Sequence, residues 1–529
     1  MGASRQLRIG VHYEPSNVDP HLGAAELALQ MTNGVFDTLV NKTADGAYRP
    51  GLAETFSISD DHLTYTFHLR KDVLFHDGTP FTAEAMKVSL DRARNPDNRS
   101  QLAGGLLGSY RESRVVNEHC LEIVLDSPYA LLLDALSQGW LAPVSLACAQ
   151  SAGGSFMLHP VGTGPFQFVR WDKTDCLVIR RNEHYAWAPD CVDNQGPPLI
   201  DEILFKFLPD DATRTAALLD GSVDMIFAAN PAEAQNLRAT DGLDVTTWPI
   251  RGVPVSLMMN IKRSPTSSLA VRQAISHALD VDALVHEVFH GEFTRAYGPV
   301  SQFTLGYEPG VENMYPHNPA QAVHLLEQEG WLPGPDGIRM REGETLRVTF
   351  YALPVNFYPQ FGAIVTRQLA QVGIAVDVEL CTPPQWIQAG MQGLHNLIPQ
   401  GKYASSSQLL GFVYHSRKSG QGSYGWSKRA AADYPQIDTL IDEAENCLTP
   451  EEFVPLFAQV QMEVMQAALA VPLHCNATIV AARDTITGLR FDAIGATRFF
   501  MTPHSSRTRP EPWHPDLSSG RGNTMIPSG

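Results

Sequence analysis

Residues Gly51–Leu90 read GLAETFSISDDHLTYTFHLRKDVLFHDGTPFTAEAMKVSL, and this stretch decides the fold. Apolar and polar residues alternate over Leu63–Leu69, which predicts a half-buried strand. Phe75–Pro80 combines glycine and proline and predicts a turn. A helix is expected to begin after Thr82, because a threonine side chain can cap the first helical turn. The stretch offers no evident acid–base or metal chemistry, so its value lies in identifying the fold.

This stretch resembles the signature of the family 5 extracytoplasmic solute-binding proteins, which deliver peptides, opines or nickel chelates to ABC importers. The resemblance rests on ordered pieces of the chain: Leu69–Val73, Asp77–Phe81, Thr82–Ala85, Val161–Phe166, Asn182–Trp187 and Ala270–Asp280. It implies an α/β fold of the large, two-lobed periplasmic-binding-protein type (cluster C), with the ligand closed between the lobes. It also implies a receptor without enzymatic activity or cofactor, which passes a small-molecule ligand to a membrane-embedded permease.

The resemblance covers roughly residues 7–500 and implies a domain division. Lobe I is expected at 1–258, with an inserted subdomain at about 45–180, lobe II at 259–480, and a return to lobe I at 481–502. The chain is expected to cross between the lobes near 254–262 and 471–483. Within lobe II, strands at 345–352 and 374–380 around a helix at 359–372 predict a βαβ unit. Val471–Ala482 reads as one mostly apolar strand, and the Ser/Pro/Arg/Gly-rich residues 503–529 predict a disordered tail.

Length and charge limit the functional classes. The 529 residues suffice for two or more domains with their own cores. The 39 basic and 57 acidic side chains give a formal charge of -18, which argues against nucleic acid or an anionic membrane as the main partner. Self-repulsion of this size favours a monodisperse, monomeric protein.

The seven cysteines form no CxxC pair, which argues against a zinc ribbon or a thioredoxin-type centre. Cys176 and Cys191 flank a predicted strand and loop and are the pair considered for a disulfide.

At the N-terminus, Met1–Ser4 leads almost directly into a strand at Leu7–Val11, with no signal peptide before it. Either a leader has been removed or the protein is cytosolic; the resemblance implies a periplasmic or extracytoplasmic location.

A rival interpretation is a zinc-dependent hydrolase. His286-Glu287-Val288-Phe289-His290 is a literal HExxH, which on a helix puts two imidazoles on one face with the glutamate as general base. Gly291 follows at once and is expected to end the helix. The third zinc ligand would have to come from distant Glu308 or Glu312. A chance match is therefore favoured over a metal site.

The segment expected to decide the ligand is Leu394–Trp426. In relatives that bind peptides, an acidic side chain here pairs with the ammonium group of the ligand. This chain has Gly401-Lys402-Tyr403-Ala404-Ser405-Ser406-Ser407 instead, so the acid is missing and a lysine is present. A buried ammonium group without a counter-charge is costly. The segment therefore favours an opine-like ligand or a modified peptide over a conventional oligopeptide, and a nickel chelate held by His415 is the third alternative.

Aromatic and cationic side chains complete the predicted site. Aromatic rings often wall such clefts, because they bury a large area with few rotatable bonds. Trp140 stands where nickel-binding relatives have an arginine, and Arg498 lies in the terminal segment that returns to the first lobe. An arginine suits a carboxylate because it binds with two parallel hydrogen bonds. Packing in the core and surface ion pairing are the alternatives for these side chains. The predicted ligand-binding residues are Trp140, Lys402, Tyr403, Ser405, Ser406, Tyr414, His415, Trp426, Thr497 and Arg498.

Overall fold

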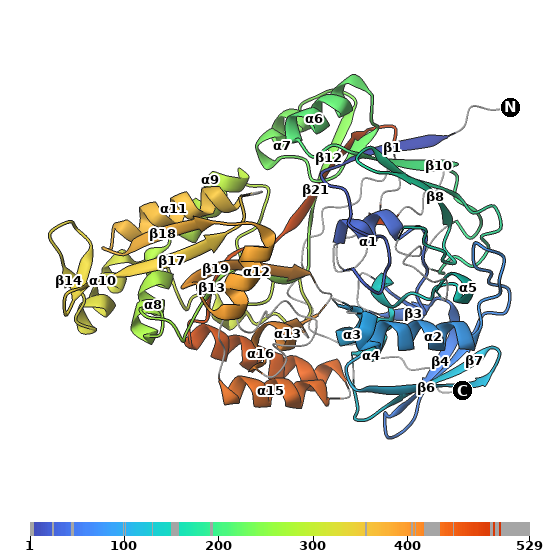
Figure 1. Ribbon diagram of the computed structural model, residues 1–529, viewed down its shortest axis with the longest axis horizontal. Helices are drawn as coiled ribbons and strands as arrows, with labels where there is room; N and C mark the ends of the chain where they lie inside the picture. Colours follow the sequence, from blue (N-terminus) through green and yellow to red (C-terminus); the bar gives the residue numbers. More distant parts are fainter. Residues whose placement is uncertain are drawn as a thin grey trace.

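The computed structural model confirms a mixed α/β fold. The structure describes residues 5–23, 26–43, 47–98, 100, 102–129, 131–149, 158–190, 194–354, 357–403, 406–407, 409–416, 434–447, 449–486, 490–491 and 497–498. Two large sheets lie in two lobes, and a smaller four-stranded sheet sits beside the first lobe (Figure 1).

The first lobe is built on a seven-stranded sheet. Its order is β12 (Leu243–Pro249), β21 (Ala477–Arg483), β11 (Met225–Ile226), β1 (Gln6–Val11), β10 (Glu202–Phe207), β9 (Cys176–Arg181) and β8 (Phe166–Asp172). Strand β1 pairs in parallel with both β10 and β11. The other neighbouring pairs in this sheet are antiparallel.

The second lobe is built on a five-stranded sheet. Its order is β18 (Ala375–Leu380), β17 (Arg347–Ala352), β19 (Leu397–Tyr403), β13 (Gly252–Met259) and β20 (Ala470–His474). The predicted βαβ unit is confirmed, because β17 and β18 pair in parallel on either side of α11 (Tyr358–Ala370). Every residue of β13 is buried, as expected of a central strand covered on both faces.

The chain crosses twice between the two sheets. Strand β12 ends at Pro249 in the first sheet and β13 begins at Gly252 in the second. The return runs from the end of β20 at His474 to the start of β21 at Ala477. The apolar run Val471–Ala482 is thus two strands in different sheets and not one. The crossing at 475–476 lies within the predicted 471–483, whereas the crossing at 250–251 lies a few residues before the predicted 254–262.

The stretch Gly51–Leu90 folds as predicted. Strand β5 (Thr64–Leu69) belongs to the four-stranded sheet with the order β4 (Ala53–Ile58), β5, β7 (Cys120–Leu125) and β6 (Tyr110–Asn117). Helix α2 (Ala83–Arg94) packs on this sheet, and the Thr82 side chain accepts a hydrogen bond from the Ala85 N–H at 3.3 Å. This four-stranded unit buries the apolar faces of β5 and α2 against each other.

The remaining elements surround these sheets. The other helices are α1 (Glu26–Thr32), α3 (Ala103–Leu106), α4 (Leu132–Leu136), α5 (Leu146–Ala149), α6 (Asp211–Asp220), α7 (Pro231–Arg238), α8 (Leu269–Ala278), α9 (Val281–Phe289), α10 (Pro319–Gln328), α12 (Pro383–Gln392), α13 (Leu409–Tyr414), α15 (Pro435–Glu445) and α16 (Pro450–Gln466), with 3₁₀ turns at Pro96–Asn98, Gly139–Leu141 and Pro309–Val311. The small strands are β2 (Val40–Lys42), β3 (Tyr48–Pro50), β14 (Leu332–Pro333), β15 (Arg339–Arg341), β16 (Glu344–Thr345), β22 (Arg490–Phe491) and β23 (Thr497–Arg498).

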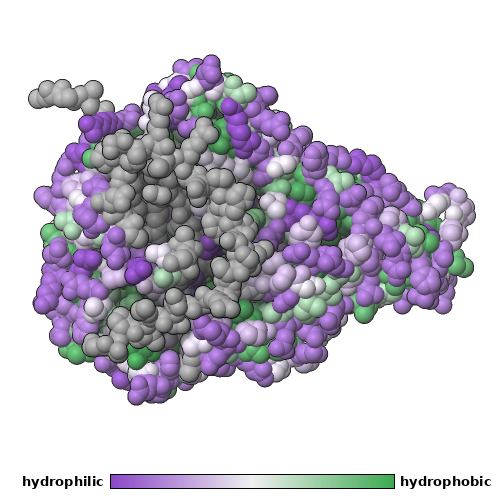
Figure 2. All heavy atoms as spheres, turned by 180° about the vertical axis from the view of Figure 1, so that it is seen from behind, coloured by the Kyte–Doolittle hydropathy of each residue, from purple (hydrophilic) through white to green (hydrophobic). Residues whose placement is uncertain are grey.

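The surface agrees with the composition. Seen from behind, hydrophilic residues cover most of the coloured surface, and apolar residues lie among them in small groups (Figure 2). Among the helices that the structure describes, none combines the length and the apolar character needed to cross a bilayer.

Cys176 is a free, buried thiol at the start of β9, so it does not form the disulfide considered above. Cys191 lies outside the described residues.

Asp37 holds together two of the motifs that carry the family resemblance. Its carboxylate accepts hydrogen bonds at 3.0 Å from Thr163 Oγ1, Tyr185 Oη and Trp187 Nε1. Thr163 belongs to the Val161–Phe166 loop, while the tyrosine and the tryptophan follow β9. The motifs therefore meet at one half-buried acceptor.

Gly162 explains why this loop can approach so closely. A Cβ at Gly162 would lie 2.1 Å from the Val35 carbonyl oxygen, which no side chain can tolerate without moving the backbone.

We expect Gly162→Ala to lower the free energy of unfolding by more than about 2 kcal/mol. Urea unfolding would measure this change. Gly196→Ala is the matched control, because its nearest neighbour would be an ordinary contact at 3.8 Å. Equal stability of the two variants would contradict the close-approach argument.

Candidate functional site

The two large sheets present the carboxyl ends of their parallel strands to each other. Strand β11 runs antiparallel to β21, so its carboxyl end points toward the crossing before Ala477. In the second sheet, the last residue of β19, Tyr403, pairs with Gly252, the first residue after the other crossing. Ligands of open α/β sheets bind beyond the carboxyl ends of the strands. The candidate site therefore lies between these two edges.

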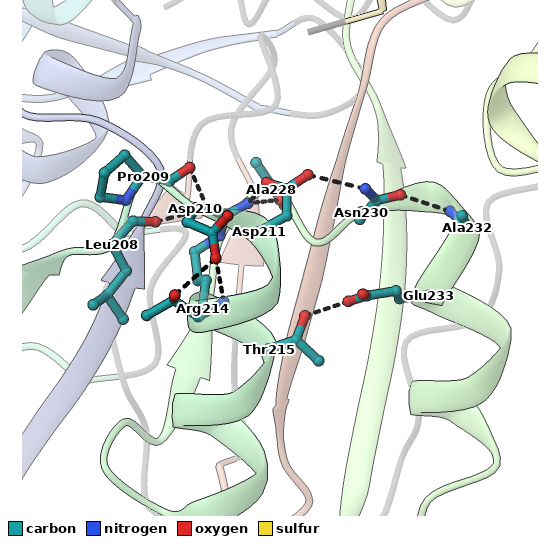
Figure 3. Close-up of polar contacts among 11 residues, drawn as sticks. Leu208, Pro209, Asp210, Asp211, Arg214, Thr215, Ala228, Asn230, Ala232 and Glu233 are labelled. Atoms are coloured by element: carbon teal, nitrogen blue, oxygen red, sulfur yellow. Dashed lines mark hydrogen bonds and ion pairs between the residues drawn. The ribbon is translucent and has the colours of Figure 1, made fainter.

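Arg214 organises the edge of the first lobe. It projects from α6 and is 1 % exposed. Its Nη1 donates to the Leu208 carbonyl at 2.7 Å, and its Nη2 donates to the Ala228 carbonyl at 2.8 Å and to Asp211 Oδ1 at 2.5 Å (Figure 3). One guanidinium thus ties together the loops after β10 and β11. Breaking a buried charge away from its partner is strongly destabilising, so Arg214 fixes the shape of this edge.

The neighbouring helices begin at this edge. The Asp210 side chain accepts from the Thr213 N–H at 2.8 Å and caps α6, and Asn230 accepts from the Ala232 N–H at 2.9 Å and caps α7. Asn230 Nδ2 also donates to Asp211 Oδ2 at 2.9 Å (Figure 3). The two caps and Arg214 make one network, in which each loop holds its neighbour.

His12 adds a neutral imidazole to the same edge. It follows β1 directly and lies close enough to Arg214 and Asp211 to sense both charges. Burial, reinforced by Arg214, lowers the pKa of His12 to about 4, so the ring is neutral near pH 7. Its buried Nδ1 has no hydrogen-bond partner within the described part of the chain. The edge therefore offers an uncharged polar group beside a guanidinium that is already neutralised.

The loop after His12 is anchored to the four-stranded unit. Arg92 of α2 pairs with the buried Asp19 carboxylate and donates from Nη1 to His21 Nδ1 at 2.8 Å. His21 Nε2 donates to the Ala142 carbonyl at 2.9 Å, so the neutral ring uses both nitrogens. Burial lowers the pKa of His21 to about 4.

This network predicts a pH dependence of stability. The unfolded chain protonates His21 below its ordinary pKa of 6.5, whereas the folded chain resists protonation down to about 4. The stability due to the neutral ring is therefore complete above pH 6.5 and is lost as the pH falls toward 4. We expect His21→Gln to reduce the slope of unfolding free energy against pH by up to about 1.4 kcal/mol per unit between pH 6 and pH 5. Urea unfolding at each pH measures it, and equal slopes would contradict it.

The edge of the second lobe is held by a loop at residues 301–307. The Gly252 N–H donates to Thr304 Oγ1 at 2.7 Å, and the Ser301 N–H donates to the Gly252 carbonyl at 2.8 Å. The Ser407 N–H donates to the Leu305 carbonyl at 3.2 Å. The same loop thus holds the start of β13 and the segment after β19. No sequence motif marks this loop, because a serine or threonine that bonds a distant backbone leaves no local pattern.

The charge of this edge differs from that of the first lobe. Segments 250–254, 300–307, 397–403 and 406–407 meet here and contain Arg251 and Lys402 but no aspartate or glutamate. Both cations are partly exposed. The Ser406 and Ser407 hydroxyls are buried and have no hydrogen-bond partner within the described residues. This edge is suited to a ligand that carries negative charge.

The predicted ligand-binding residues separate into two groups. The structure brings Lys402, Tyr403 and Ser406 to the edge just described. Tyr414 is instead fully buried, and Trp140, 5 % exposed, packs in the same hydrophobic core. His415 is buried in a network with α15, where its Nε2 lies 3.0 Å from Asp442 Oδ1. These three side chains have packing and hydrogen-bonding roles in this structure.

The other predicted ligand-binding residues stay predictions. Ser405 and Trp426 lie outside the described residues. Thr497 and Arg498 form β23, which pairs with β22.

The HExxH stretch does not form a metal site. Helix α9 ends at Phe289, and His290 follows in the left-handed region with φ of 53°. The two imidazoles therefore do not share a helical face. Glu287 is exposed and pairs with Arg367 at 2.7 Å. Within the described part of the chain, neither histidine belongs to a group of three possible metal ligands.

The sheets, the facing edges and the double crossing define a two-lobed solute receptor. The chain belongs to the bacterial extracellular solute-binding proteins, family 5, whose sequence model ("family 5 Middle") matches residues 47–424. The predicted family and cluster C fold are confirmed. Family membership makes the protein a non-enzymatic substrate-binding component of an ABC importer, which rejects the hydrolase interpretation.

Individual relatives bind several kinds of solute. The chain is 27% identical over 504 residues to the glutathione-binding protein GsiB of Salmonella choleraesuis (strain SC-B67), with 92% of each chain covered. It superposes on NikA from Brucella suis in complex with Fe(III)-EDTA with a TM-score of 0.83, at 24% identity, over 94% of this chain and 100% of NikA. For AgaA from A. tumefacien R10 in complex with agropinic acid, the TM-score is 0.77 at 24% identity, over 94% of this chain and 96% of AgaA.

Proposed function

We propose that this receptor binds a small, anionic modified peptide of the chemical class of glutathione between the two facing edges. The charge of the second-lobe edge carries the proposal, since Arg251 and Lys402 bring two positive charges to it. Glutathione has two carboxylates and one ammonium group, so it fits a cationic edge better than an acidic one. The glutathione-binding relative, which matches 92% of this chain, supports the same class.

Opines share the chemistry that the edge selects. They are also carboxylate-rich condensation products of amino acids, so the residues at the edge favour both classes over a conventional peptide. A conventional oligopeptide balances its one ammonium group with one carboxylate, so it gains less from a cationic edge than glutathione, whose two carboxylates leave a net negative charge. The burial of His415 against Asp442 supports the anionic ligand over the nickel alternative.

The receptor is proposed to work as an extracytoplasmic monomer that closes on its ligand and presents the closed form to its permease. Rotation about the crossings at 250–251 and 475–476 would bring the two edges together, as in other hinge-closing binding proteins. The ligand shifts the balance by binding the closed form more tightly than the open form.

A ligand screen tests the proposed class. We expect glutathione or an opine such as mannopinic acid to raise the melting temperature and to bind with one-to-one stoichiometry in isothermal titration calorimetry. Native mass spectrometry of the protein as purified would identify a retained ligand by mass. A response confined to dipeptides and tripeptides with ordinary peptide bonds, or to a nickel–histidine chelate, would contradict the proposal.

Lys402 provides the residue-level test. We expect Lys402→Met to weaken binding of the anionic ligand by about tenfold or more, because one charge-assisted contact is lost. Lys87→Met is the matched control, since Lys87 pairs with Asp91 at 2.6 Å on the partly exposed face of α2. Calorimetry of both variants with glutathione, at low and at high salt, measures the effect. Equal affinities of the two variants would place Lys402 outside the site.

A further inference from the structure

Helix α3 of the four-stranded unit directly contacts helix α13 of the second lobe. In Figure 1, α3 lies on the side of the four-stranded unit that faces α13, although about three hundred residues separate the two helices in the sequence. The Phe412 ring lies against Gly105: a Cβ built on Gly105 would be 2.7 Å from both Cε1 and Cζ of Phe412. Real Cβ atoms do not approach other atoms so closely, so a larger residue at position 105 would force the Phe412 ring to shift.

The contact belongs to a larger apolar interface. Leu102 and Leu106 of the α3 region and Leu409 and Val413 of the α13 region are buried in one continuous hydrophobic cluster, and Phe412 packs against it. The core of the four-stranded unit and the helical layer of the second lobe are thus joined in this conformation.

Helix α13 follows the ligand-binding edge within a few residues. Strand β19 ends at Tyr403, Ser406 and Ser407 form the edge, and α13 begins at Leu409. The α13 helix also packs on β13 and α15, so it moves with the second lobe. A ligand that seats on the segment 402–407 therefore positions the helix that carries Phe412.

A second contact joins the lobes on the other side of the crossing strands. Glu292, just after α9, forms an ion pair with Arg238 of α7, with Arg238 Nη2 donating to Glu292 Oε2 at 2.7 Å. Thr247 of β12 donates to the same oxygen at 2.6 Å. In Figure 1 the α7–α9 contact and the α3–α13 contact lie on opposite sides of β21. The α7–α9 contact thereby holds the lobes together on one side of the hinge. On the other side, rotation of the lobes would break the α3–α13 contact.

We propose that Phe412 and Gly105 form a latch that stabilises the conformation in which the four-stranded unit and the second lobe are in contact. The proposal rests on the receptor function given above and deepens it, because the latch sets how often the lobes close and how long a bound ligand stays. Phe412 is a positioning residue that acts through the angle between the lobes. Removing a contact made in one conformation lowers the population of that conformation.

The first test needs no ligand. Spin labels on cysteines introduced at Val116 of β6 and Leu332 of β14 report the distance between the four-stranded unit and the second lobe; both positions are exposed. We expect Phe412→Ala to lower the ratio of short to long distances at least about fivefold. Gly105→Ala should act in the same direction, because its methyl group meets the ring. Circular dichroism and thermal melting confirm that each variant is folded.

The double variant separates a latch from a general effect on stability. If the added methyl acts by meeting the ring, Gly105→Ala should have no further effect once Phe412 is alanine, which gives a non-additive cycle. Alanine is otherwise the better helix former, so without the latch Gly105→Ala would be neutral or stabilising. Unchanged distances in both single variants, or additive effects, would overturn the proposal.

Glutathione serves as the probe in a second arm. We expect Phe412→Ala to raise the dissociation rate of glutathione at least about fivefold with little change in the association rate. Lack of glutathione binding by the unsubstituted protein would contradict the proposed ligand and leave the distance test decisive for the latch. Gly196→Ala, in an open position, is the control for both arms.

Discussion

The double crossing of the chain is the constraint on which the structure depends. Because β12 and β13 are consecutive strands in different sheets, and β20 and β21 are too, each lobe contains strands from distant parts of the sequence. The pairing of these strands fixes the direction of the parallel strands in both sheets. The carboxyl edges must then face each other across the crossings. The ligand site is therefore a consequence of topology before any side chain is considered.

The two facing edges have different electrostatic characters, and this difference divides their roles. Arg214 on the first edge has its charge satisfied by Asp211 and two carbonyl oxygens, so it shapes the loops and adds little net charge. Arg251 and Lys402 are partly exposed and bring two positive charges to the second edge. The first edge can thus act as a rigid neutral wall, and the second can select the charge of the ligand.

The sequence predicted those parts of the fold that local patterns determine. Strand β5 and the Thr82 cap of α2 follow from alternation and capping chemistry, and Asp37 explains why the motifs at Thr163, Tyr185 and Trp187 occur together. Roles that depend on distant partners were not predictable. Arg214 and His12 belong to no motif. The sequence around an aromatic residue such as Tyr414 does not show whether the side chain lies in a core or in the wall of a cleft. For Arg214, the run Asp210–Asp211 before an amphipathic helix is the signal that marks a capped helix end, but it does not reveal the carbonyls that the arginine binds.

Charge selection and closure contribute to affinity in different ways. Under the proposed function, the cationic edge selects the ligand by charge and acts mainly on encounter and on the contacts of the open form. The α3–α13 contact differs from that edge in its chemistry, because it packs an aromatic ring against a glycine. It carries no charge and does not discriminate between ligands. Affinity is the product of intrinsic binding and the fraction of closed receptor. A chain that changes its edge residues can therefore acquire a new ligand while it keeps the same latch, which separates the evolution of specificity from that of the closing motion.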